Sequence, residues 1–330
     1  MAQQTTNPVL LNQIDAGVIG RKRGHGYESA LASRINALSC PIKKTELSPR
    51  YIECGRPELI LVNKILHYLD WESSSSIQAY STGRLATAED GEKEITIGGI
   101  SIKGCKSDII IELHNELGES RVIGVSVKQC NNKTPTNAQV YFSTATAFYN
   151  TIVNSGYLLS EDALVALKQF CGDIGYRPCD NNDCRNRLST PERYFWEEIH
   201  DAGRAEWEDL FTNHQDEITR LLLQKAYKND PFPPEIILHK TKKAVPENEE
   251  IAIFSMDEFI RLSRGYSPFD CGKYRVKKGR YKEPEGVEHL APRFGVVQMQ
   301  RGGQKQHPTQ LQFNLKAGYF YHPPFSDVKR

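Results

Sequence analysis

Two side chains of opposite charge, Asp108 and Lys128, lie at the two ends of a segment with the pattern of a β-hairpin. Residues 108–113 and 121–127 are rich in β-branched side chains, and the sequence HNELGES between them is typical of a turn. Such a hairpin brings both charges to one edge of a sheet. There a carboxylate can hold a hard cation, and an ammonium group can orient or help to deprotonate the water that attacks a phosphodiester.

The alternation of side chains along a strand decides which neighbours share the face of these two groups. Successive side chains of a strand point to opposite faces, so Ser126 lies on the face of Lys128, and Glu112 lies on the face of Asp108. A short pattern of this kind also fits an ordinary hairpin that ends in a solvated lysine. The residues around the hairpin are therefore needed to choose between the two interpretations.

An aspartate, a hairpin turn and a strand that ends in acid-x-Lys together resemble the core of the PD-(D/E)xK nucleases, and the resemblance covers residues 20–150. This chain departs from that pattern twice, with Ser107 in place of proline and Ser126 in place of the second acidic residue. The resemblance implies that Asp108, Lys128 and Ser126 are catalytic. It also implies that one metal ligand must come from elsewhere in the chain.

A helix before the hairpin offers a carboxylate for this purpose. The sequence GHGYESALASRINALSC has apolar residues at the spacing of one helix face, namely Tyr27, Leu31, Ile35 and Leu38. Glu28 lies in the first turn, where the helix N-terminus favours a negative charge, and that is one sufficient reason for its position. In many nucleases that this chain resembles, a glutamate of the helix before the sheet reaches the metal. The resemblance therefore implies that Glu28 replaces the acid missing at Ser126.

The resemblance implies one or two Mg²⁺ ions in each active site. The implied ligands are Asp108, Glu28, the backbone carbonyl of Val127 and, as a substitute, Glu112. Lys128 would position the attacking water and stabilise the pentavalent phosphorane. Ser126 would hold a metal-bound water, because a hydroxyl group cannot supply the missing charge.

The composition of the 330 residues, 39% hydrophobic and 25% charged, is that of an ordinary soluble globular protein. We expect it to be cytoplasmic and not bound to a membrane, because the sequence has neither a membrane-spanning apolar run nor the features of a signal peptide at its start. The eight cysteines are then expected to be reduced thiols. A structural zinc site would use Cys171, Cys179 and Cys184, with His200 as a fourth ligand. Seven and four residues separate the three cysteines, and this spacing argues against such a site.

The resemblance implies an α/β (α+β) fold, in which a mixed β-sheet is flanked by helices and carries a helical insertion and a C-terminal β-rich recognition region. The expected division is a nuclease core with the catalytic hairpin over 1–155, a helical region over 156–230, and a DNA-recognition region over 231–330 that packs on the core. Local patterns predict a strand over 95–104 and helices over 57–71, 134–153, 160–172, 190–228 and, after a Ser255-x-x-Glu258 capping box, 255–267.

The Thr134-Pro135 pair predicts a helix start directly after Lys128 and its strand. Asn132 and Lys133 would then lie near the scissile phosphate, because free backbone N–H groups at a helix N-terminus bind anions. A plain helix with a capped start is the simpler interpretation of the same residues.

The C-terminal part combines basic and amide side chains, although the net charge of the whole chain is only +1. Lys277, Lys278 and Arg280 lie in a basic, tyrosine-bearing stretch and are candidates for phosphate contacts. Two strands joined by RGGQKQHPTQ follow. Arginine, lysine and glutamine can read base edges in the major groove, and the candidates for this role are Arg301, Gln304, Lys305 and Gln306. The alternatives are a solvated basic loop and a polar surface hairpin.

Taken together, the hairpin, the preceding helix and the distal segment make the chain resemble a type II restriction endonuclease of the PD-(D/E)xK class. The resemblance implies Mg²⁺-dependent double-strand cuts in DNA at a short specific sequence, a homodimer, and a functional pairing with a cognate DNA methyltransferase. Two alternatives stay open: a non-catalytic sequence-specific DNA-binding protein, and a repair or mobile-element nuclease with the same core.

Overall fold

A computed structural model describes residues 25–48, 51–86, 94–129, 138–181, 193–225, 230–240, 249–266, 268–276, 287–301 and 309–316. The chain divides into two compact units, each built from separate stretches of sequence. Among the described residues, the hairpin unit comprises those of 25–138 and 220–262, and the second unit comprises those of 139–219 and 263–316.

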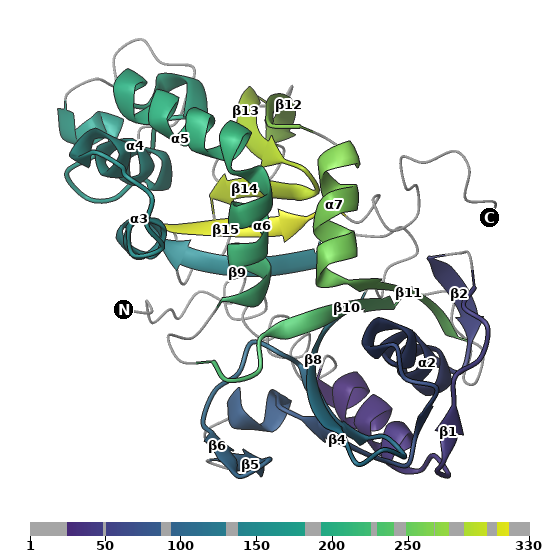
Figure 1. Ribbon diagram of the computed structural model, residues 1–330. Helices are drawn as coiled ribbons and strands as arrows, with labels where there is room; N and C mark the ends of the chain where they lie inside the picture. The colour runs from purple at the N-terminus through teal and green to yellow at the C-terminus, as the bar shows by residue number, and fades with distance from the viewer. Residues whose placement is uncertain are drawn as a thin grey trace, which may run out of the picture. The chain divides into compact units, whose positions relative to one another are not determined.

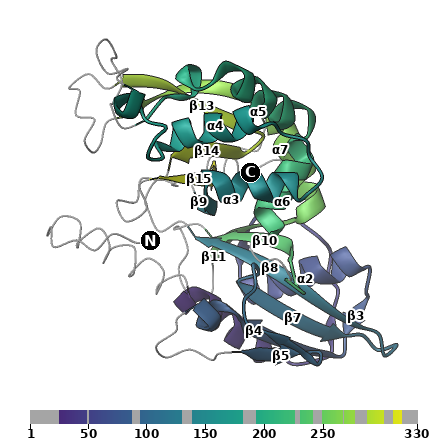
Figure 2. The same ribbon diagram turned by 90° about the vertical axis from the view of Figure 1, so that its left-hand side faces the viewer.

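A six-stranded sheet forms the centre of the hairpin unit (Figure 1). Across the sheet, its strands are β2 Ile52–Gly55, β11 Glu249–Ser255, β10 Pro234–Lys240, β8 Ser120–Gln129, β7 Ile109–His114 and β4 Ser76–Ser81. β10 is parallel to β8, whereas the other neighbours are antiparallel, so the sheet is mixed. Figure 2 shows β4, β7 and β8 side by side. The predicted hairpin is confirmed, with Ile109 opposite Val125.

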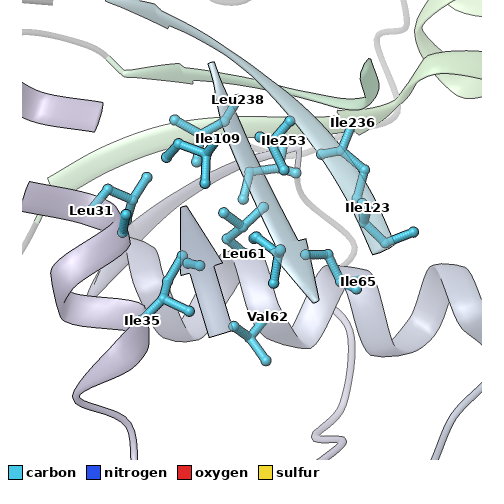
Figure 3. Packing of buried hydrophobic residues seen from close by; sticks show 14 of the residues in the cluster. Leu31, Ile35, Leu61, Val62, Ile65, Ile109, Ile123, Ile236, Leu238 and Ile253 are labelled. Atoms are coloured by element: carbon cyan, nitrogen blue, oxygen red, sulfur yellow. The ribbon is translucent and has the colours of Figure 1, made fainter. Parts of the chain in front are cut away.

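Two helices cover one face of this sheet, and both were predicted. The first spans 25–36, and α2 spans Pro57–Leu69. Figure 3 shows their side chains directed toward those of the strands; the labelled residues are Leu31, Ile35, Leu61, Val62, Ile65, Ile109, Ile123, Ile236, Leu238 and Ile253. Burial of each such side chain stabilises the fold by about 1.5–3 kcal/mol. Because Leu31 and Ile35 are fully buried, the first helix has the single apolar stripe that its spacing predicts.

The strand register separates the two faces of the β7–β8 hairpin. Odd-numbered residues such as Ile111 and Val125 pack in the helix-covered core. Even-numbered residues therefore point to the opposite face. There, Ile110 packs in a small separate cluster with Ile97 and Ile102. The side chains of chemical interest lie on this second face.

The segment 95–104 is not the single strand that its alternation predicted. It folds as a small hairpin of β5 Ile95–Ile97 and β6 Ile100–Ile102. Gly98 and Gly99, with φ of 55° and 79°, form the turn between the two strands. A Gly-Gly pair readily adopts positive φ at both central positions of a two-residue hairpin turn, and this signal was present in the sequence.

The second unit contains a five-stranded sheet. Across it, the strands are β12 Asp270–Val276, β13 Val287–Phe294, β14 Val297–Arg301, β15 Gln310–Leu315 and β9 Ala138–Thr144. Its helices include α3 Ala145–Val153, α4 Glu161–Cys171 and α5 Asp201–Asn213. One face of the sheet packs against aromatic rings of these helices, since the Phe148 and Phe313 ring centroids are 4.7 Å apart and those of Phe211 and Phe294 are 4.6 Å apart.

The helix predicted over 134–153 is wrong for residues 138–144, which form strand β9. The sequence AQVYFST carries aromatic and β-branched residues, and β9 lies beside β15 at the edge of the sheet. Helix α3 begins only after Thr144, whose hydroxyl group accepts a hydrogen bond from the Ala147 N–H at 3.2 Å. The conformation of this segment is therefore determined by pairing with a strand far along the chain, and not by the local helix-start signal.

The other helical predictions mostly agree with the structure. Helix α4 matches the prediction over 160–172. The stretch 190–228 includes a 3-10 helix at Trp196–Glu198, then α5, then α6 Gln215–Gln224. Helix α7 Met256–Tyr266 follows the predicted capping box, in which the Glu258 N–H donates to Ser255 Oγ at 3.2 Å. In the described part of the chain, none of the helices has the length and apolar character needed to cross a membrane.

The predicted α/β class with a mixed sheet flanked by helices is confirmed. The three-part division of the chain stays a prediction. The structure does show that β10 and β11, expected in the C-terminal recognition region, pair within the sheet of the hairpin.

Candidate functional site

Asp108 lies immediately before β7, at the point where the pairing of β7 with β8 ends and β8 continues. The Asp108 N–H donates to the Val125 carbonyl at 2.9 Å, and Val125 is the last residue of β8 that pairs with β7. β8 then runs on to Gln129 alongside β10. The Asp108 side chain is thereby placed against the exposed backbone edge of β8.

Three donors of β8 converge on one oxygen of this carboxylate. Asp108 Oδ2 accepts from the Val127 N–H at 2.6 Å, from Ser126 Oγ at 3.2 Å and from Lys128 Nζ at 3.3 Å. Because these contacts all use Oδ2, they leave Oδ1 available to a cation. The side chains of Asp108 and Lys128 are 28% and 15% exposed, so they are partly desolvated but still within reach of a substrate.

Ser126 links the two charged groups. Lys128 Nζ donates to Ser126 Oγ at 2.8 Å and to the Val127 carbonyl at 3.2 Å. The hydroxyl group in turn donates to Asp108 Oδ2. The serine at the usual acidic position thus orients both neighbours without adding a negative charge.

Glu28 belongs to the same cluster, although it comes from the helix over 25–36. It is 6% exposed. Burial and then the negative charge of Asp108 raise the pKa of Glu28 to about 8, while Lys128 lowers it. A carboxyl group held in this way would lose its proton readily if a cation were bound beside it. The structure therefore brings Glu28, Asp108 and Lys128 together.

Two further residues of the cluster were missed in the sequence. His239 of β10 is fully buried and lies opposite Lys128 in the parallel ladder, so both side chains share a face. Burial and then the charge of Lys128 lower the pKa of His239 to about 4, which makes it a neutral imidazole at pH 7. No local pattern reveals it, because β10 is distant in sequence from β8.

Lys106 is the second missed residue, and its position two residues before Asp108 was a usable signal. Burial and then the charge of Lys128 lower the pKa of Lys106 to about 8, although Asp108 and Asp230 oppose this shift. A second cationic side chain therefore lies within electrostatic range of the cluster.

The segment before β7 is held in place by residues 230–233. The Lys106 N–H donates to Asp230 Oδ2 at 2.6 Å, and Ser107 Oγ donates to the Phe232 carbonyl at 2.7 Å. Gly124 permits this packing, because a Cβ atom there would lie 2.2 Å from Ser107 Oγ and 2.6 Å from the Pro233 carbonyl oxygen. Asp108 follows directly, so its position depends on this close approach.

The structure does not bring Glu112 to the cluster. It lies on β7 four residues from Asp108, which corresponds to about 13 Å along a strand. Several predicted DNA contacts fall outside the described residues, namely Asn132, Lys133, Lys277, Lys278, Arg280, Gln304, Lys305 and Gln306. Only the backbone of Arg301, the last residue of β14, is described.

A row of amide side chains occupies one face of the β14–β15 pair in the second unit. Gln298 lies opposite Asn314, and Gln300 lies opposite Gln312. Gln300 Nε2 donates to Gln298 Oε1 at 2.8 Å, and Gln312 Nε2 donates to Asn314 Oδ1 at 3.1 Å. The alternate residues Met299 and Phe313 are buried. These amide side chains thus share a single face, on which Gln298 and Asn314 are buried.

The donor set decides which metal could be held. In the described stretches, no group of three or more His, Cys, Asp and Glu side chains is arranged to hold a metal ion. Two carboxylates with neighbouring hydroxyl and carbonyl oxygens fit Mg²⁺, which binds through one or two carboxylates and keeps several waters. For the cysteines, Cys171 is buried in α4, Cys179 is exposed, and Cys184 lies outside the described residues.

No protein-family model and no curated protein matches the chain. Among solved structures, the chain is similar to the crystal structure of restriction endonuclease MspI in complex with its cognate DNA. The two chains are 13% identical, the match covers 78% of each, and the TM-score is 0.43. A likeness this distant assigns no function to the chain.

Proposed function

We propose that the protein is a type II restriction endonuclease that makes Mg²⁺-dependent double-strand cuts in DNA at a short specific sequence. The observation that carries this proposal is the cluster at the end of the β7–β8 hairpin. There Asp108, Ser126 and Lys128 are joined by hydrogen bonds, and Glu28 lies within electrostatic range of Asp108 and Lys128. Two carboxyl groups beside an ammonium group form a set suited to phosphodiester hydrolysis.

Asp108 and Glu28, with the backbone carbonyl of Val127, would hold Mg²⁺. When bound, the ion would supply positive charge to the phosphate and acidify a coordinated water. The protein supports this role by supplying two carboxyl groups from different elements. The Val127 N–H and Ser126 fix the orientation of Asp108 through its Oδ2 atom.

Lys128 would act on the attacking water and on the phosphate. Its ammonium group is held by Ser126 Oγ and the Val127 carbonyl, so it projects from a defined place beside Asp108. There it would orient the water and stabilise the negative charge that develops on the phosphoryl oxygens. Ser126 would orient a water through its hydroxyl group, which leaves Glu28 to supply the second negative charge.

The DNA contacts of this proposal include residues whose structure is not described. Lys277, Lys278, Arg280, Asn132 and Lys133 would contact phosphates. The residues that would read bases are Arg301, Gln304, Lys305 and Gln306, and the partly exposed Gln300 and Gln312 of β14 and β15 extend this set. A palindromic site would require a homodimer with one active site for each strand. A cognate DNA methyltransferase would protect the host DNA, and the enzyme would act in the cytoplasm.

Incubation of the protein with phage DNA in Mg²⁺ or in EDTA tests the proposal. Discrete fragments that form only with Mg²⁺ support a restriction endonuclease. A nicked or smeared product would instead indicate a repair or mobile-element nuclease. Intact DNA of reduced electrophoretic mobility would indicate a binding protein without catalysis. Sequencing of the fragment ends would then give the recognition sequence and the cut position.

Glu28→Gln tests whether Glu28 is the metal ligand that replaces the acidic residue missing at position 126. We expect this variant to lose most of the Mg²⁺-supported rate, because removal of a carboxylate weakens both ion binding and stabilisation of transition-state charge. Glu112→Gln is the matched control and should cleave at the wild-type rate. If Glu112→Gln loses cleavage while Glu28→Gln keeps it, the ligand lies on β7 and the helix assignment is wrong.

A further inference from the structure

A buried carboxylate on β11 holds the helix that carries Glu28. Glu249, the first residue of β11, is 6% exposed. Its Oε2 atom accepts a hydrogen bond from the Tyr27 hydroxyl at 2.8 Å, and its Oε1 atom accepts one from Arg34 Nη1 at 2.9 Å. Both donors belong to the helix over 25–36, and Tyr27 is the immediate neighbour of Glu28.

The surroundings of Glu249 favour its ionised form. Burial opposes ionisation, but the hydrogen bonds from Arg34 and Tyr27 and the charge of Lys240 lower the pKa of Glu249 overall. Lys240 Nζ is 3.7 Å from Glu249 Oε2 and 4.2 Å from the centroid of the Tyr27 ring. The carboxylate therefore joins β10, β11 and the first helix at one point. Removal of its charge would loosen all three contacts.

The far end of the same helix has a separate anchor. Asn36 Nδ2 donates to the Ala79 carbonyl at 2.9 Å, and the Ala79 N–H donates to Asn36 Oδ1 at 2.6 Å. Near the start of the helix, Ser29 Oγ donates to Ser81 Oγ of β4 at 3.3 Å, and the contacts of Glu249 hold the helix against β11. A carboxylate about 6 Å from a helix axis moves by about 1 Å for each 10° of rotation. The position of Glu28 is therefore sensitive to the contact between Tyr27 and Glu249.

We infer that Glu249 is a positioning residue for the Glu28 carboxylate and that it sets the affinity of the site for a divalent cation without touching the cation. This inference rests on the proposed function, in which Glu28 is a metal ligand. Partners of this kind, one step removed from a metal, commonly change metal affinity by about 10- to 100-fold when they are replaced.

Binding of Mn²⁺ to the full chain, followed by electron paramagnetic resonance without DNA, tests the inference. We expect Glu249→Gln to weaken Mn²⁺ binding about 10-fold, because the amide keeps the shape of the side chain and loses its charge. Glu53→Gln is the matched control, since Glu53 lies on the neighbouring strand β2 opposite Ile251 and should leave Mn²⁺ binding unchanged. Thermal unfolding of each variant shows whether it is folded.

The double variant Glu28→Gln, Glu249→Gln separates positioning from a general loosening of the fold. If Glu249 acts through Glu28, the double variant binds Mn²⁺ as weakly as Glu28→Gln alone. Additive losses would overturn the inference, as would wild-type affinity in Glu249→Gln when Glu28→Gln has lost it. Unchanged binding in Glu28→Gln and Asp108→Ala would instead overturn the proposed metal site itself.

Tyr27→Phe keeps the test decisive if Glu249→Gln does not fold. This variant removes one hydroxyl group and its hydrogen bond to Glu249, and it changes no charge at neutral pH. We expect a weakening of Mn²⁺ binding about 3-fold, close to the loss of one ordinary hydrogen bond. Wild-type affinity in a folded Tyr27→Phe variant would count against the inference.

Discussion

Two hairpins of this protein share one design and differ in what they place on their polar face. In both β7–β8 and β14–β15, alternate residues are apolar and buried on the other face. The β7–β8 hairpin gathers Asp108 and Lys128 at one end, with Ser126 between them. The β14–β15 pair spreads neutral amides along its length, and each amide bonds its neighbours. One face concentrates charge, whereas the other repeats neutral donors and acceptors.

In the proposed function, this difference separates a face suited to chemistry from a face suited to recognition. Charged groups that meet in a partly buried place polarise water and stabilise transition-state charge, because their interactions are strong where water is excluded. A row of neutral amides gives little electrostatic stabilisation, but its partly exposed members, Gln300 and Gln312, offer hydrogen-bonding groups that could match base edges. We therefore expect substitutions in the two hairpins to affect different measurements.

The largest effect should come from the charged hairpin. Asp108→Ala and Lys128→Ala should each reduce the cleavage rate by at least about 1000-fold, because each removes a group that acts on the phosphate or the water. Sequence-specific DNA binding in Ca²⁺ should stay close to that of the wild type. Cleavage kinetics with Mg²⁺ and binding assays with Ca²⁺ check the two expectations separately.

Lys103→Ala is a suitable control for these variants, since the Lys103 side chain is 80% exposed and should leave the rate unchanged. Wild-type cleavage by Asp108→Ala or Lys128→Ala would remove the chemical role from the β7–β8 hairpin. The contrast between the two hairpins would then fail.

Gly124→Ala should disturb the same hairpin through packing alone. An added Cβ atom would overlap Ser107 Oγ and the Pro233 carbonyl, so we expect the free energy of unfolding to fall by about 3 kcal/mol. Chemical denaturation measures this loss. Gly26→Ala is the control, because a Cβ atom there meets nothing within 4 Å. Equal stability of the two variants would show that the approach of Ser107 to β8 is looser than the structure indicates.

The buried imidazole beside Lys128 predicts a dependence of stability on pH. The pKa of His239 is lowered from 6.5 to about 4, so between these values the unfolded chain binds more protons than the folded protein. The stability contributed by the neutral imidazole is therefore lost as the pH falls. At pH 5 the free energy of unfolding should be about 2 kcal/mol lower than at pH 8 from this group alone.

Denaturation of wild type and His239→Gln across this pH range measures the contribution. The variant cannot be protonated at this position and should show a shallower loss of stability. His114→Gln, which changes a 45% exposed side chain, is the control for the substitution of a histidine by glutamine. If His239→Gln keeps the wild-type slope, the imidazole is not held neutral by the fold.

The smallest effects should come from the amide row. Replacement of Gln300 or Gln312 by Ala should cost about 1–3 kcal/mol of discrimination and relax the preference at one base position. We expect the same of Arg301, Gln304, Lys305 and Gln306. Replacement of Lys277 or Lys278 should weaken binding to all sequences and flatten its salt dependence. Competition binding against single-base variants of the cognate site at two salt concentrations distinguishes these outcomes.

The opposite pattern is informative as well. If the amide variants lose affinity uniformly while the lysine variants shift base preference, the basic stretch and the amide row have exchanged roles. The basic stretch, and not the β14–β15 pair, would then be the segment to compare with the β7–β8 hairpin.

Local patterns in the sequence were sufficient to predict the parts of the site that lie on neighbouring strands or on a single helix. Two runs rich in β-branched residues and the turn residues between them predicted the β7–β8 hairpin, and hence the meeting of Asp108 with Lys128. The helical stripe predicted the burial of Leu31 and Ile35. The departure from the nuclease pattern at Ser126 also led to the prediction that Glu28 supplies the missing carboxylate. The structure places Glu28 within electrostatic range of Asp108.

The sequence was insufficient wherever distant segments pair. The parallel pairing of β10 with β8, which brings His239 beside Lys128, joins residues about 110 positions apart and leaves no local signal. The contact of Glu249 with Tyr27 spans 222 positions. Strand β9 was missed for a similar reason, since its partner β15 lies near the other end of the chain. Long-range pairing here overrides local propensity.

Each unit is built from separate stretches of the chain, and the order of these stretches has a consequence for the gene. Of the described residues, the hairpin unit takes those of 25–138 and 220–262, and the second unit those of 139–219 and 263–316. No single recombination junction can therefore exchange one of these units for that of a related gene. A premature stop codon after position 219 would delete β10 and β11 together with β12 to β15, so one lesion would damage both the charged and the amide faces.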